Sequence, residues 1–435
     1  MDDASQTPDA TDARVAEQYE AYPYPPRDPA KELTVNTVGS PSHLAEIDHW
    51  VFGAARPASR PLNALVAGGG TGDGTIMLAQ HLADAGRAGS VTYLDRSAAA
   101  RRIAEARAQA RGLTNLVWRS DSLLDLPGLG MGPFDYIDCC GVLHHLPDPA
   151  GGLAALASVL APGGGMGLMV YAPHGRTGVY MMQDALKLLA PPGLPPAERV
   201  GIARRLIGRK ERTQEGGPVG YPDLPPTNWF AFNPLITDHV IGGDAGTYDL
   251  LLHERDRAYR VAELAELLDG AGLAVTAWIE PRRYDPAIYI RDARLKAAAS
   301  ALPPTERAAL AEAMAGNMRT HVVYCVRKDA VPAPPDPLRP DAVPVLRSLD
   351  GTKVADAIRP DGTFGVNFEM FPFSLALPRL ARAILRQIDG RRSVAEIRAA
   401  VVAGGASDSA FDRDWPLLWE AFNGINRLLL APPAH

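Results

Sequence analysis

The chain has 435 residues, 46% of them hydrophobic and 22% charged, a composition typical of a globular protein with more than one domain. Its formal net charge of -6 argues against a large nucleic-acid surface, because such surfaces are basic. No apolar run reaches the roughly 18 residues of a membrane span. The three cysteines and the acidic first residues predict the reducing cytoplasm as the location. We therefore expect neither a nucleic acid nor a membrane as a partner.

The N-terminal segment, residues 1–59, carries three tyrosines within six positions: Tyr19, Tyr22 and Tyr24. A short helix is predicted over residues 12–20, before prolines that hold the tyrosine stretch extended. A second helix is predicted over residues 42–53, with Ser42 as its N-cap. Two interpretations of the tyrosines stay open: a flap over a ligand, or a hydrophobic belt around the domain.

Residues 63–74 form the segment around which the rest of the chain is organised. A short apolar run ends in a glycine cluster, and a helical pattern follows it. This order predicts a strand, a tight turn and a helix, the opening of a nucleotide-binding unit. Gly68, Gly70 and Gly72 let the backbone turn sharply and approach a ligand, because they carry no Cβ. The N–H groups at the start of the helix suit a polar or anionic ligand group.

Strand and helix patterns then alternate along the chain. Strands are predicted over residues 91–94, 116–119, 134–140 and 166–171, helices over 98–111 and 152–160, and a glycine turn over 162–165. Such alternation predicts an α/β fold with a doubly wound, mostly parallel sheet. Ligands of these sheets bind at the carboxyl ends of the strands. The glycine turn, Asp95, Asp121 and Gly141 would meet there.

Three segments downstream of the glycine turn indicate which nucleotide the protein binds. Residues 134–149 read Phe-Asp-Tyr-Ile-Asp-Cys-Cys-Gly-Val-Leu-His-His-Leu-Pro-Asp-Pro, residues 161–165 Ala-Pro-Gly-Gly-Gly, and residues 120–123 Ser-Asp-Ser-Leu. Together with the glycine loop and an acidic strand end, they resemble the motifs of class I S-adenosylmethionine-dependent methyltransferases. The resemblance covers residues 60–172, and more loosely residues 260–327. It implies a Rossmann-like core and S-adenosylmethionine, not a nicotinamide, as the cofactor.

The resemblance also implies how the cofactor is held. The loop from Gly68 to Gly72 would pass its methionine portion, Asp95 would accept hydrogen bonds from both ribose hydroxyls, and Asp121 and Ser122 would face the adenine. The cofactor-binding residues expected on this basis are Tyr19, Gly68, Gly70, Gly72, Asp73, Asp95, Arg96, Asp121, Ser122 and Gly141.

One position departs from the family pattern. The acidic residue often found two positions before the first loop glycine is replaced by Val66. In the family that carboxylate helps to orient the loop and the amino group of the cofactor, so another group must substitute for it. Asp73 and the N-terminal tyrosines are the candidates. The departure also leaves open a non-catalytic scaffold or regulator that binds the cofactor.

The acceptor site is expected in an insertion, residues 174–255, that would cover the open edge of the sheet. This segment holds a basic stretch over residues 204–212, read as a solvated helix face, and a glycine-rich loop at 216–220. The catalytic candidates are His145, Tyr24, Asn228 and His253, and the substrate candidates are Tyr22, Tyr180, Trp229 and Asn233. His145 would be either a general base or a structural residue. No spacing of Cys and His forms a four-ligand set, so no metal is expected.

The remaining residues complete the core and add a module. Residues 60–173 and 256–328 would form the methyltransferase core, with a helix at 261–271, a strand at 274–279, a helix at 304–317 and a strand at 321–326. A proline-rich linker at 329–344 leads to a module at 345–435 with strands at 353–358 and 363–368 and helices at 377–388 and 415–430. Ser393 and Glu396 form a capping box. The module resembles winged-helix modules and the C-terminal domains of bacterial protein methyltransferases. The alternative is a module for stability or homodimerisation.

The expected reaction is an in-line methyl transfer from a sulfonium to a nucleophile. A thioether leaving group needs no acid, so the enzyme has to position the acceptor, exclude water and remove a proton. The preferred acceptor is a nitrogen of a protein or peptide side chain. A small-molecule acceptor, nitrogen or oxygen, is the alternative.

Overall fold

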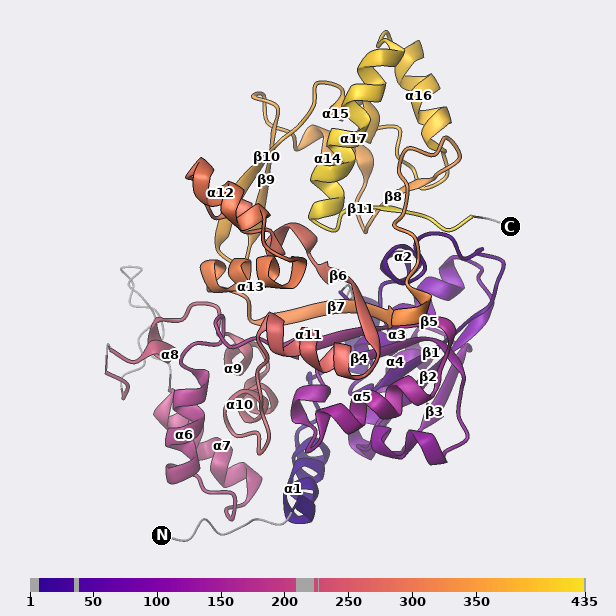
Figure 1. Cartoon of the computed structure of the whole chain (residues 1–435). Helices are drawn as coiled ribbons and strands as arrows, with labels where there is room; N and C mark the ends of the chain where they lie inside the picture. Colours follow the sequence, from indigo (N-terminus) through magenta and orange to yellow (C-terminus); the bar gives the residue numbers. More distant parts are fainter. Residues whose placement is uncertain (1–7, 35–38, 209–222, 226, 434–435) are drawn as a thin grey trace.

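The computed structural model describes residues 8–34, 39–208, 223–225 and 227–433 (Figure 1). Its centre is a seven-stranded sheet formed by β1 (Leu62–Ala67), β2 (Gly89–Leu94), β3 (Leu116–Arg119), β4 (Phe134–Cys140), β5 (Leu160–Tyr171), β6 (Leu273–Ile279) and β7 (Thr320–Arg327). The strand order is β3-β2-β1-β4-β5-β7-β6. β7 runs antiparallel to both of its neighbours, and the other pairs are parallel. The predicted α/β class with a doubly wound sheet is confirmed.

Both faces of this sheet are covered, and the side chains of β1 show how. Leu65 and Ala67 point into one buried cluster, and Ala64 and Val66 into the other. A strand buried on both faces is a continuous apolar run, which is why 64–67 lacks polar alternation. The helices that connect or flank the strands are α3 (Asp73–Asp84), α4 (Ala98–Ala110), α5 (Pro149–Ser158), α11 (Val261–Gly270), α12 (Ala293–Ser300) and α13 (Pro304–Ala315).

Two local predictions in the core were wrong. The glycine turn predicted at 162–165 is an irregularity inside β5 and not a turn before it: Gly163 has φ +72°, and the pairing of β5 with β4 jumps from Leu160 to Gly165. The helix predicted over 42–53 is shorter and consists of α2 (Leu44–Glu46) and a π-helical turn, η2 (Ile47–Val51). Ser42 does not cap it, because the Ser42 hydroxyl donates to Asp138 of β4 instead.

The insertion is a helical layer beside the sheet, on the left in Figure 1. It contains α6 (Val179–Leu189), α7 (Pro196–Leu206), α8 (Trp229–Phe232), α9 (Asp238–Ile241) and α10 (Gly243–Leu251), with a buried cluster of its own. The N-terminal helix α1 (Pro8–Ala21) runs beside the core and contacts α4. The predicted glycine-rich loop at 216–220 and the basic residues at 209–212 lie outside the described residues.

The C-terminal module lies above the sheet in Figure 1. Its elements are β8 (Pro344–Leu346), α14 (Gly351–Asp356), β9 (Thr363–Phe368), β10 (Phe371–Ala376), α15 (Ala381–Leu385), α16 (Val394–Ala403), α17 (Asp408–Gly424) and β11 (Leu428–Leu430). β9 pairs with β10 and β8 with β11, both antiparallel. The capping box of Ser393 and Glu396 is present. A winged-helix relationship stays a prediction.

Three of the predicted boundaries in this module were wrong. Residues 353–358 are mainly helical, because the Asp350 carboxylate accepts the N–H of Lys353 and starts α14. α15 is shorter than the helix predicted at 377–388. α17 begins and ends earlier than predicted, with Pro416 inside it, and Leu428–Leu430 is a strand.

The module is fixed to the segment before β1 by buried polar contacts. Arg347 forms an ion pair with Glu46, whose side chain is fully buried. Trp50 donates its indole N–H to Asn426 at 3.0 Å, and His49 accepts the N–H of Leu430 at 3.1 Å. Contacts of this kind join the core and the module into one body. Within the described part of the chain, no helix has both the length and the hydropathy needed to cross a bilayer.

Candidate active site

The glycine turn after β1 can be built only from residues without a Cβ. Gly68 has φ +81°, and a Cβ there would lie 2.2 Å from Cγ2 of Val142. Gly72, which precedes α3, has φ +100°, and its Cβ would lie 2.9 Å from that of Ala104. Both positions combine a left-handed backbone with close packing, so another residue would add steric strain of both kinds. The Tyr93 hydroxyl donates to the Gly70 carbonyl at 2.8 Å and holds the turn in place.

A cavity of about 730 Å³ opens at the carboxyl ends of the strands, above this turn. A volume of that size is in the range of small-molecule and cofactor sites. All but one of the predicted cofactor residues line it; they are Tyr19, Gly68, Gly70, Asp73, Asp95, Arg96, Asp121, Ser122 and Gly141. The exception, Gly72, shapes the turn from behind. The cavity therefore brings together residues that are up to 122 positions apart in the sequence (141 minus 19).

Asp95 is oriented by the backbone at the end of β2. One carboxylate oxygen accepts the N–H of Gly70 at 2.7 Å, and the other accepts the N–H of Ser97 at 2.8 Å. Burial raises the pKa of Asp95, although these N–H groups oppose the shift. Each oxygen keeps a second lone pair for a ligand donor.

Asp73 is less available than the sequence suggested. Its carboxylate forms ion pairs with Arg27 and, at 2.7 Å, with Arg107, which is fully buried. Burial raises the pKa of Asp73, but the hydrogen bonds and charges of these two arginines outweigh it, so the net shift is downward. This carboxylate is already compensated by two cations, and it is a poor substitute for the acid absent at Val66.

The tyrosine segment covers part of the cavity. Tyr24 and Pro25 line it, and the Pro25 carbonyl accepts the Thr71 hydroxyl at 2.7 Å. The hydroxyl of Tyr19 points toward the insertion, to Asp249 at 3.4 Å and His253 at 3.2 Å. Tyr22 does not line the cavity and stacks on Tyr248. The flap interpretation thus fits two of the three tyrosines, and the belt interpretation fits Tyr22.

A buried polar cluster closes the cavity on the side of the insertion. Asp249 of α10, which is 3% exposed, accepts the Tyr171 hydroxyl at 2.9 Å. The ring of His145 stacks on that of His253 with 3.8 Å between their centroids. Burial raises the pKa of Asp249, whereas burial and the neighbouring His145 lower the pKa of His253 well below its usual range. His253 is therefore neutral at physiological pH.

The backbone of Arg255 fixes the tautomers of the two imidazoles. Its carbonyl lies 2.6 Å from Nδ1 of His145, so that nitrogen carries the proton, and in the neutral ring Nε2 is the acceptor. Its N–H donates to Nδ1 of His253 at 3.0 Å, so the neutral His253 carries its proton on Nε2. The cluster therefore presents one basic nitrogen and one donor.

Potential ligand atoms of His145, Asp249 and His253 lie within 4.8 Å of one another. Two imidazoles and a carboxylate are ligands that several divalent metals accept. A metal would have to displace the Nε2 proton of His253, whose other nitrogen is occupied by the Arg255 N–H. The hydrogen bond from Arg255 therefore disfavours His253 as a metal ligand.

A second layer of contacts holds Tyr171 in position. The guanidinium of Arg176 lies 3.6 Å from the centroid of the Tyr171 ring. Arg176 is itself paired with Asp256 at 2.8 Å, and both side chains are almost completely buried. Packing of this kind limits the rotation of the Tyr171 hydroxyl that faces Asp249.

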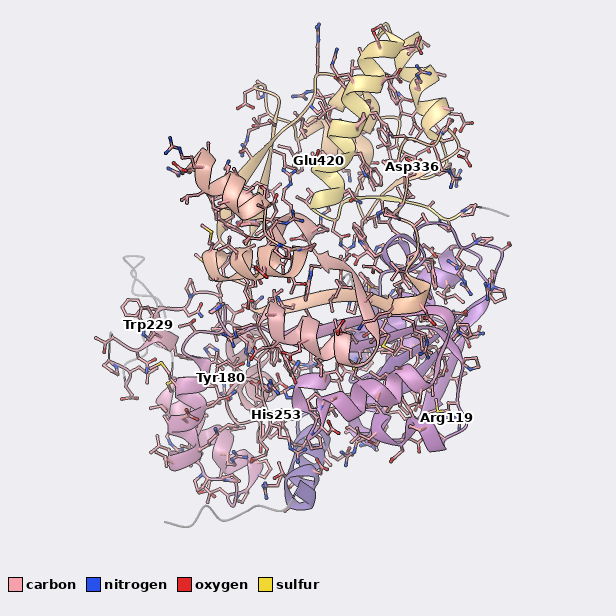
Figure 2. The ribbon with its side chains drawn as sticks, viewed as in Figure 1. Arg119, Tyr180, Trp229, His253, Asp336 and Glu420 are labelled. Atoms are coloured by element: carbon pink, nitrogen blue, oxygen red, sulfur yellow. The ribbon has the colours of Figure 1, made fainter. Side chains whose placement is uncertain are left out.

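The other acceptor candidates are not at the cavity. Asn228 caps α8 by accepting the N–H of Phe230, and the Asn233 amide donates to the carbonyls of Gly175 and Thr177. Trp229 is 59% exposed and lies at the outer edge of the insertion, far from His253 (Figure 2). Tyr180 contacts Arg176 at 3.3 Å and does not line the cavity. These four residues, like Tyr22 and His253, are not among those that line the cavity, and their roles in catalysis or substrate binding stay predictions.

Sequence reasoning missed Asp249, Tyr171, Ser42 and Asp138. Asp138 carried a signal, because an acidic residue inside an apolar buried strand is unusual. Asp249 carried none, since nothing in the sequence indicates that α10 approaches His145.

Comparisons with known proteins agree with this geometry. Residues 65–166 match the family model of a methyltransferase domain. The chain is 30% identical over 209 residues to a ubiquinone biosynthesis O-methyltransferase of Paracidovorax citrulli, covering 48% of this chain and 82% of that protein. It is 32% identical over 282 residues to an uncharacterized protein of Synechococcus sp., covering 64% of this chain and 63% of that protein. It therefore spans less than two thirds of the length of the latter relative.

Among solved structures, PKMT2 of Rickettsia typhi in complex with AdoHcy has the same fold. The likeness covers 89% of this chain and 75% of that protein, with a TM-score of 0.61 and 13% identity. The part of this chain that resembles PKMT2 extends beyond the sheet, whereas the match to the family model ends at residue 166. By its motifs, its strand order and these matches, the chain belongs to the class I S-adenosylmethionine-dependent methyltransferases, and its cofactor is S-adenosylmethionine.

Proposed function

We propose that this protein transfers the methyl group of S-adenosylmethionine to an amine nitrogen of a protein or peptide side chain. The observation that carries the proposal is the buried cluster at the wall of the cofactor cavity. It offers a carboxylate, Asp249, beside the imidazole of His145, whose Nδ1 hydrogen-bonds to the Arg255 carbonyl and leaves Nε2 free. An amine acceptor needs both groups, because it arrives protonated and reacts only as the free base.

Two observations support the binding of the cofactor in this cavity. Gly68, Gly70 and Gly141 line the cavity and carry no side chain, so a ligand can approach the backbone there. Asp95 presents a carboxylate, fixed by two N–H groups, at the strand end where a ribose would lie. When bound, S-adenosylmethionine supplies an electrophilic methyl group and a neutral thioether as the leaving group.

The residues of the cluster would act on the acceptor in turn. Asp249 attracts the acceptor ammonium into the cavity, and the hydroxyls of Tyr171 and Tyr19 hold that carboxylate in place. Nε2 of His145 accepts one ammonium proton, which frees the nitrogen lone pair for attack on the methyl carbon. A bound S-adenosylmethionine would supply the methyl group to this nitrogen, and the electron pair of its S–CH₃ bond would leave with the thioether sulfur. The burial of His145 and Asp249 keeps water from competing.

The extent of the fold supports a macromolecular acceptor. The likeness to the fold of PKMT2 covers most of the chain, including parts outside the sheet. A core alone suffices to bind the cofactor, so additional layers are more readily explained by a large acceptor. In this proposal the insertion covers the acceptor side chain, the C-terminal module contributes to acceptor recognition, and the reaction takes place in the cytoplasm.

A second candidate is methyl transfer to a small molecule. It is favoured by the 30% identity to a ubiquinone biosynthesis O-methyltransferase, which spans 82% of that protein. The Nε2 atom of His145 would serve a hydroxyl acceptor as well as an amine.

A methyl assay separates the two candidates. The protein is incubated with S-adenosylmethionine labelled in the methyl group and an extract of the source organism, divided into macromolecular and small-molecule fractions. We expect alkali-stable label on protein, since N-methyl bonds resist base and esters do not. Label confined to small molecules would support the second candidate. Cofactor binding without transfer to either fraction would contradict both and favour a scaffold. His145→Gln, which has no basic nitrogen, is the control for background methylation.

A further inference from the structure

Asp138 is a buried carboxylate that lines the cofactor cavity and is only half satisfied. It lies on β4, and 1% of its surface is exposed. One oxygen accepts the hydroxyl of Ser42, which also lines the cavity. The other oxygen, Oδ1, has no hydrogen-bond partner among the described residues. An unpaired carboxylate oxygen in a buried position is costly, and it is retained where a ligand completes it.

The position of Asp138 fits one end of an elongated cofactor. Asp138 pairs directly with Val66 in the register of the parallel strands β4 and β1. Val66 lies two positions before Gly68, the first residue of the glycine turn. Asp95 stands at the end of β2, on the other side of β1. The two acids therefore flank the glycine turn from opposite sides. A ligand whose ribose meets Asp95 and whose chain crosses the turn reaches Asp138 with its other end.

Asp138 also lies close to the first turn of α3. A Cβ at Gly74 would be 3.1 Å from the Asp138 oxygen Oδ2 and 3.1 Å from the Ser42 hydroxyl. Glycine at 74 thus leaves room for both side chains at the start of this helix. In that direction the carboxylate is packed closely, so its unpaired oxygen is the part that remains for a ligand.

No arginine or lysine of the described chain forms an ion pair with Asp138, in contrast to Asp73, which has two. The charge is left for a cation that comes with a ligand. S-adenosylmethionine carries two cationic groups, a sulfonium and the α-ammonium of its methionine moiety. Only the ammonium has N–H donors for a carboxylate oxygen and a serine hydroxyl.

We propose that Asp138, oriented by Ser42, binds the α-ammonium group of S-adenosylmethionine. The carboxylate absent at Val66 is supplied by the residue beside it on the neighbouring strand. Asp138 has no part in the transfer chemistry, which the proposed function assigns to His145. The inference rests on the cofactor, and it holds for either class of acceptor.

The test is calorimetric titration of the full chain with three ligands: S-adenosylmethionine, S-adenosylhomocysteine, and the deaminated analogue of S-adenosylhomocysteine, which keeps the carboxylate. Wild type should bind S-adenosylhomocysteine more tightly than the analogue by about 10- to 100-fold, the usual effect of a hydrogen bond to a charged group. Asp138→Asn should weaken S-adenosylhomocysteine by a similar factor and leave the analogue no weaker than in wild type. Ser42→Ala should have a smaller effect in the same direction.

Asp135→Asn is the matched control. Asp135 lies on the same strand, pairs with Arg56 and does not line the cavity, so its variant should bind both ligands as wild type does.

A second readout is the number of protons released when the ligand binds. Burial raises the pKa of Asp138 to about 6, although the Ser42 hydroxyl and, to a smaller extent, the Cys140 N–H oppose the shift. At pH 6 the carboxyl is therefore about half protonated, and a bound ammonium should expel about 0.5 proton per site. Titrations in buffers of different ionisation enthalpy should show this release in wild type and none in Asp138→Asn.

The outcomes that overturn the proposal are distinct. Unchanged affinity of Asp138→Asn for S-adenosylhomocysteine, or equal weakening of both ligands, would assign Asp138 a structural role. A loss limited to S-adenosylmethionine would assign it to the sulfonium. If wild type binds neither S-adenosylmethionine nor S-adenosylhomocysteine, the cofactor assignment itself fails.

Discussion

His145 and His253 stack face to face, 3.8 Å between ring centroids, and one residue sets both of their tautomers. The carbonyl of Arg255 accepts a hydrogen bond from Nδ1–H of His145, and its N–H donates a hydrogen bond to Nδ1 of His253. Because Arg255 acts through its backbone, these roles are independent of its side chain. The pair provides an acceptor nitrogen and a donor nitrogen beside the same carboxylate, Asp249.

Replacing His145 should reduce turnover without affecting the cofactor. General-base catalysis contributes roughly 10²- to 10⁴-fold, so His145→Ala should lower kcat by about that factor. The binding of S-adenosylhomocysteine should stay within about threefold, since Asp95 and the glycine turn are untouched. kcat on the acceptor found by methyl labelling and the calorimetric Kd check the two expectations.

His145→Gln separates the base from a structural role. Glutamine can still donate to the Arg255 carbonyl but has no basic nitrogen. If His145 is the base, the glutamine variant is as slow as the alanine variant. Recovery of activity in His145→Gln would assign the residue to structure alone.

Tyr171→Phe should shift the pH dependence of the reaction. Burial raises the pKa of Asp249, and the Tyr171 hydroxyl is among the groups that lower it again. Removing that hydroxyl raises the pKa further, so the acidic limb of kcat/KM should move to higher pH. Tyr180→Phe is the matched control, because its hydroxyl contacts Arg176 and not Asp249. An unchanged acidic limb in Tyr171→Phe would remove Asp249 from the reaction.

The cofactor half of the site could be predicted from the sequence, and the acceptor half could not. Asp95 and Gly141 follow strands whose ends are recognisable, so topology alone brings them together. Asp249 reaches the site through α10, within an insertion that has no fixed pattern, and Arg255 contributes only backbone atoms. Ser42 and Asp138 are 96 positions apart, and only the folded chain shows their contact.

The errors in secondary structure also have physical causes. Gly165 suggests a turn in the sequence, yet it lies in β5. The residue there is glycine because a Cβ would lie 2.5 Å from Val51 and 2.8 Å from the Cys325 carbonyl. Gly165 therefore allows close packing around β5 and does not reverse the chain. In the C-terminal module, the Asp350 cap overrides the apolar alternation from which a strand at 353–358 was predicted.

Gly68→Ala should destabilise the protein and abolish cofactor binding. The left-handed backbone costs an alanine about 1–2 kcal/mol, and the clash with Val142 adds about 1–3 kcal/mol. Urea unfolding should show the sum, about 2–5 kcal/mol.

Val142→Ala provides the second arm of a double-mutant cycle for this clash. In the Gly68→Ala background it should recover the clash part only, because the backbone strain remains. Strictly additive effects of the two substitutions would show that the side chains do not meet.

Arg347→Met should destabilise the core and the C-terminal module together. Removing one partner of a buried ion pair costs about 3–5 kcal/mol, because Glu46 then stays buried with only hydroxyl donors. Thermal unfolding should remain a single transition at lower temperature. Arg386→Met, which removes an exposed pair with Asp356, should change stability by less than about 1 kcal/mol. Two separate transitions in Arg347→Met would show that the module is an independent unit.

Asp138→Asn should stabilise the ligand-free protein at neutral pH. With a pKa of about 6 when folded and about 3.9 when unfolded, Asp138 favours folding at low pH, and this contribution is lost as pH rises from about 4 to about 6. Above that window the buried charge costs about 3 kcal/mol, as an order of magnitude. Urea unfolding without ligand should find the variant more stable than wild type at pH 7.5, by a larger margin than at pH 5. A variant less stable than wild type at pH 7.5 would contradict an unsatisfied carboxylate.

The most direct measurement of the whole account is calorimetry with S-adenosylhomocysteine on wild type and on Asp95→Ala. The carboxylate of Asp95 is held at the strand end by the N–H groups of Gly70 and Ser97, and it is expected to bind the ribose. Wild type should bind one ligand per chain, and Asp95→Ala should lose at least tenfold in affinity, about 1.4 kcal/mol. No binding by wild type, or equal affinity in Asp95→Ala, would contradict a cofactor held above the glycine turn.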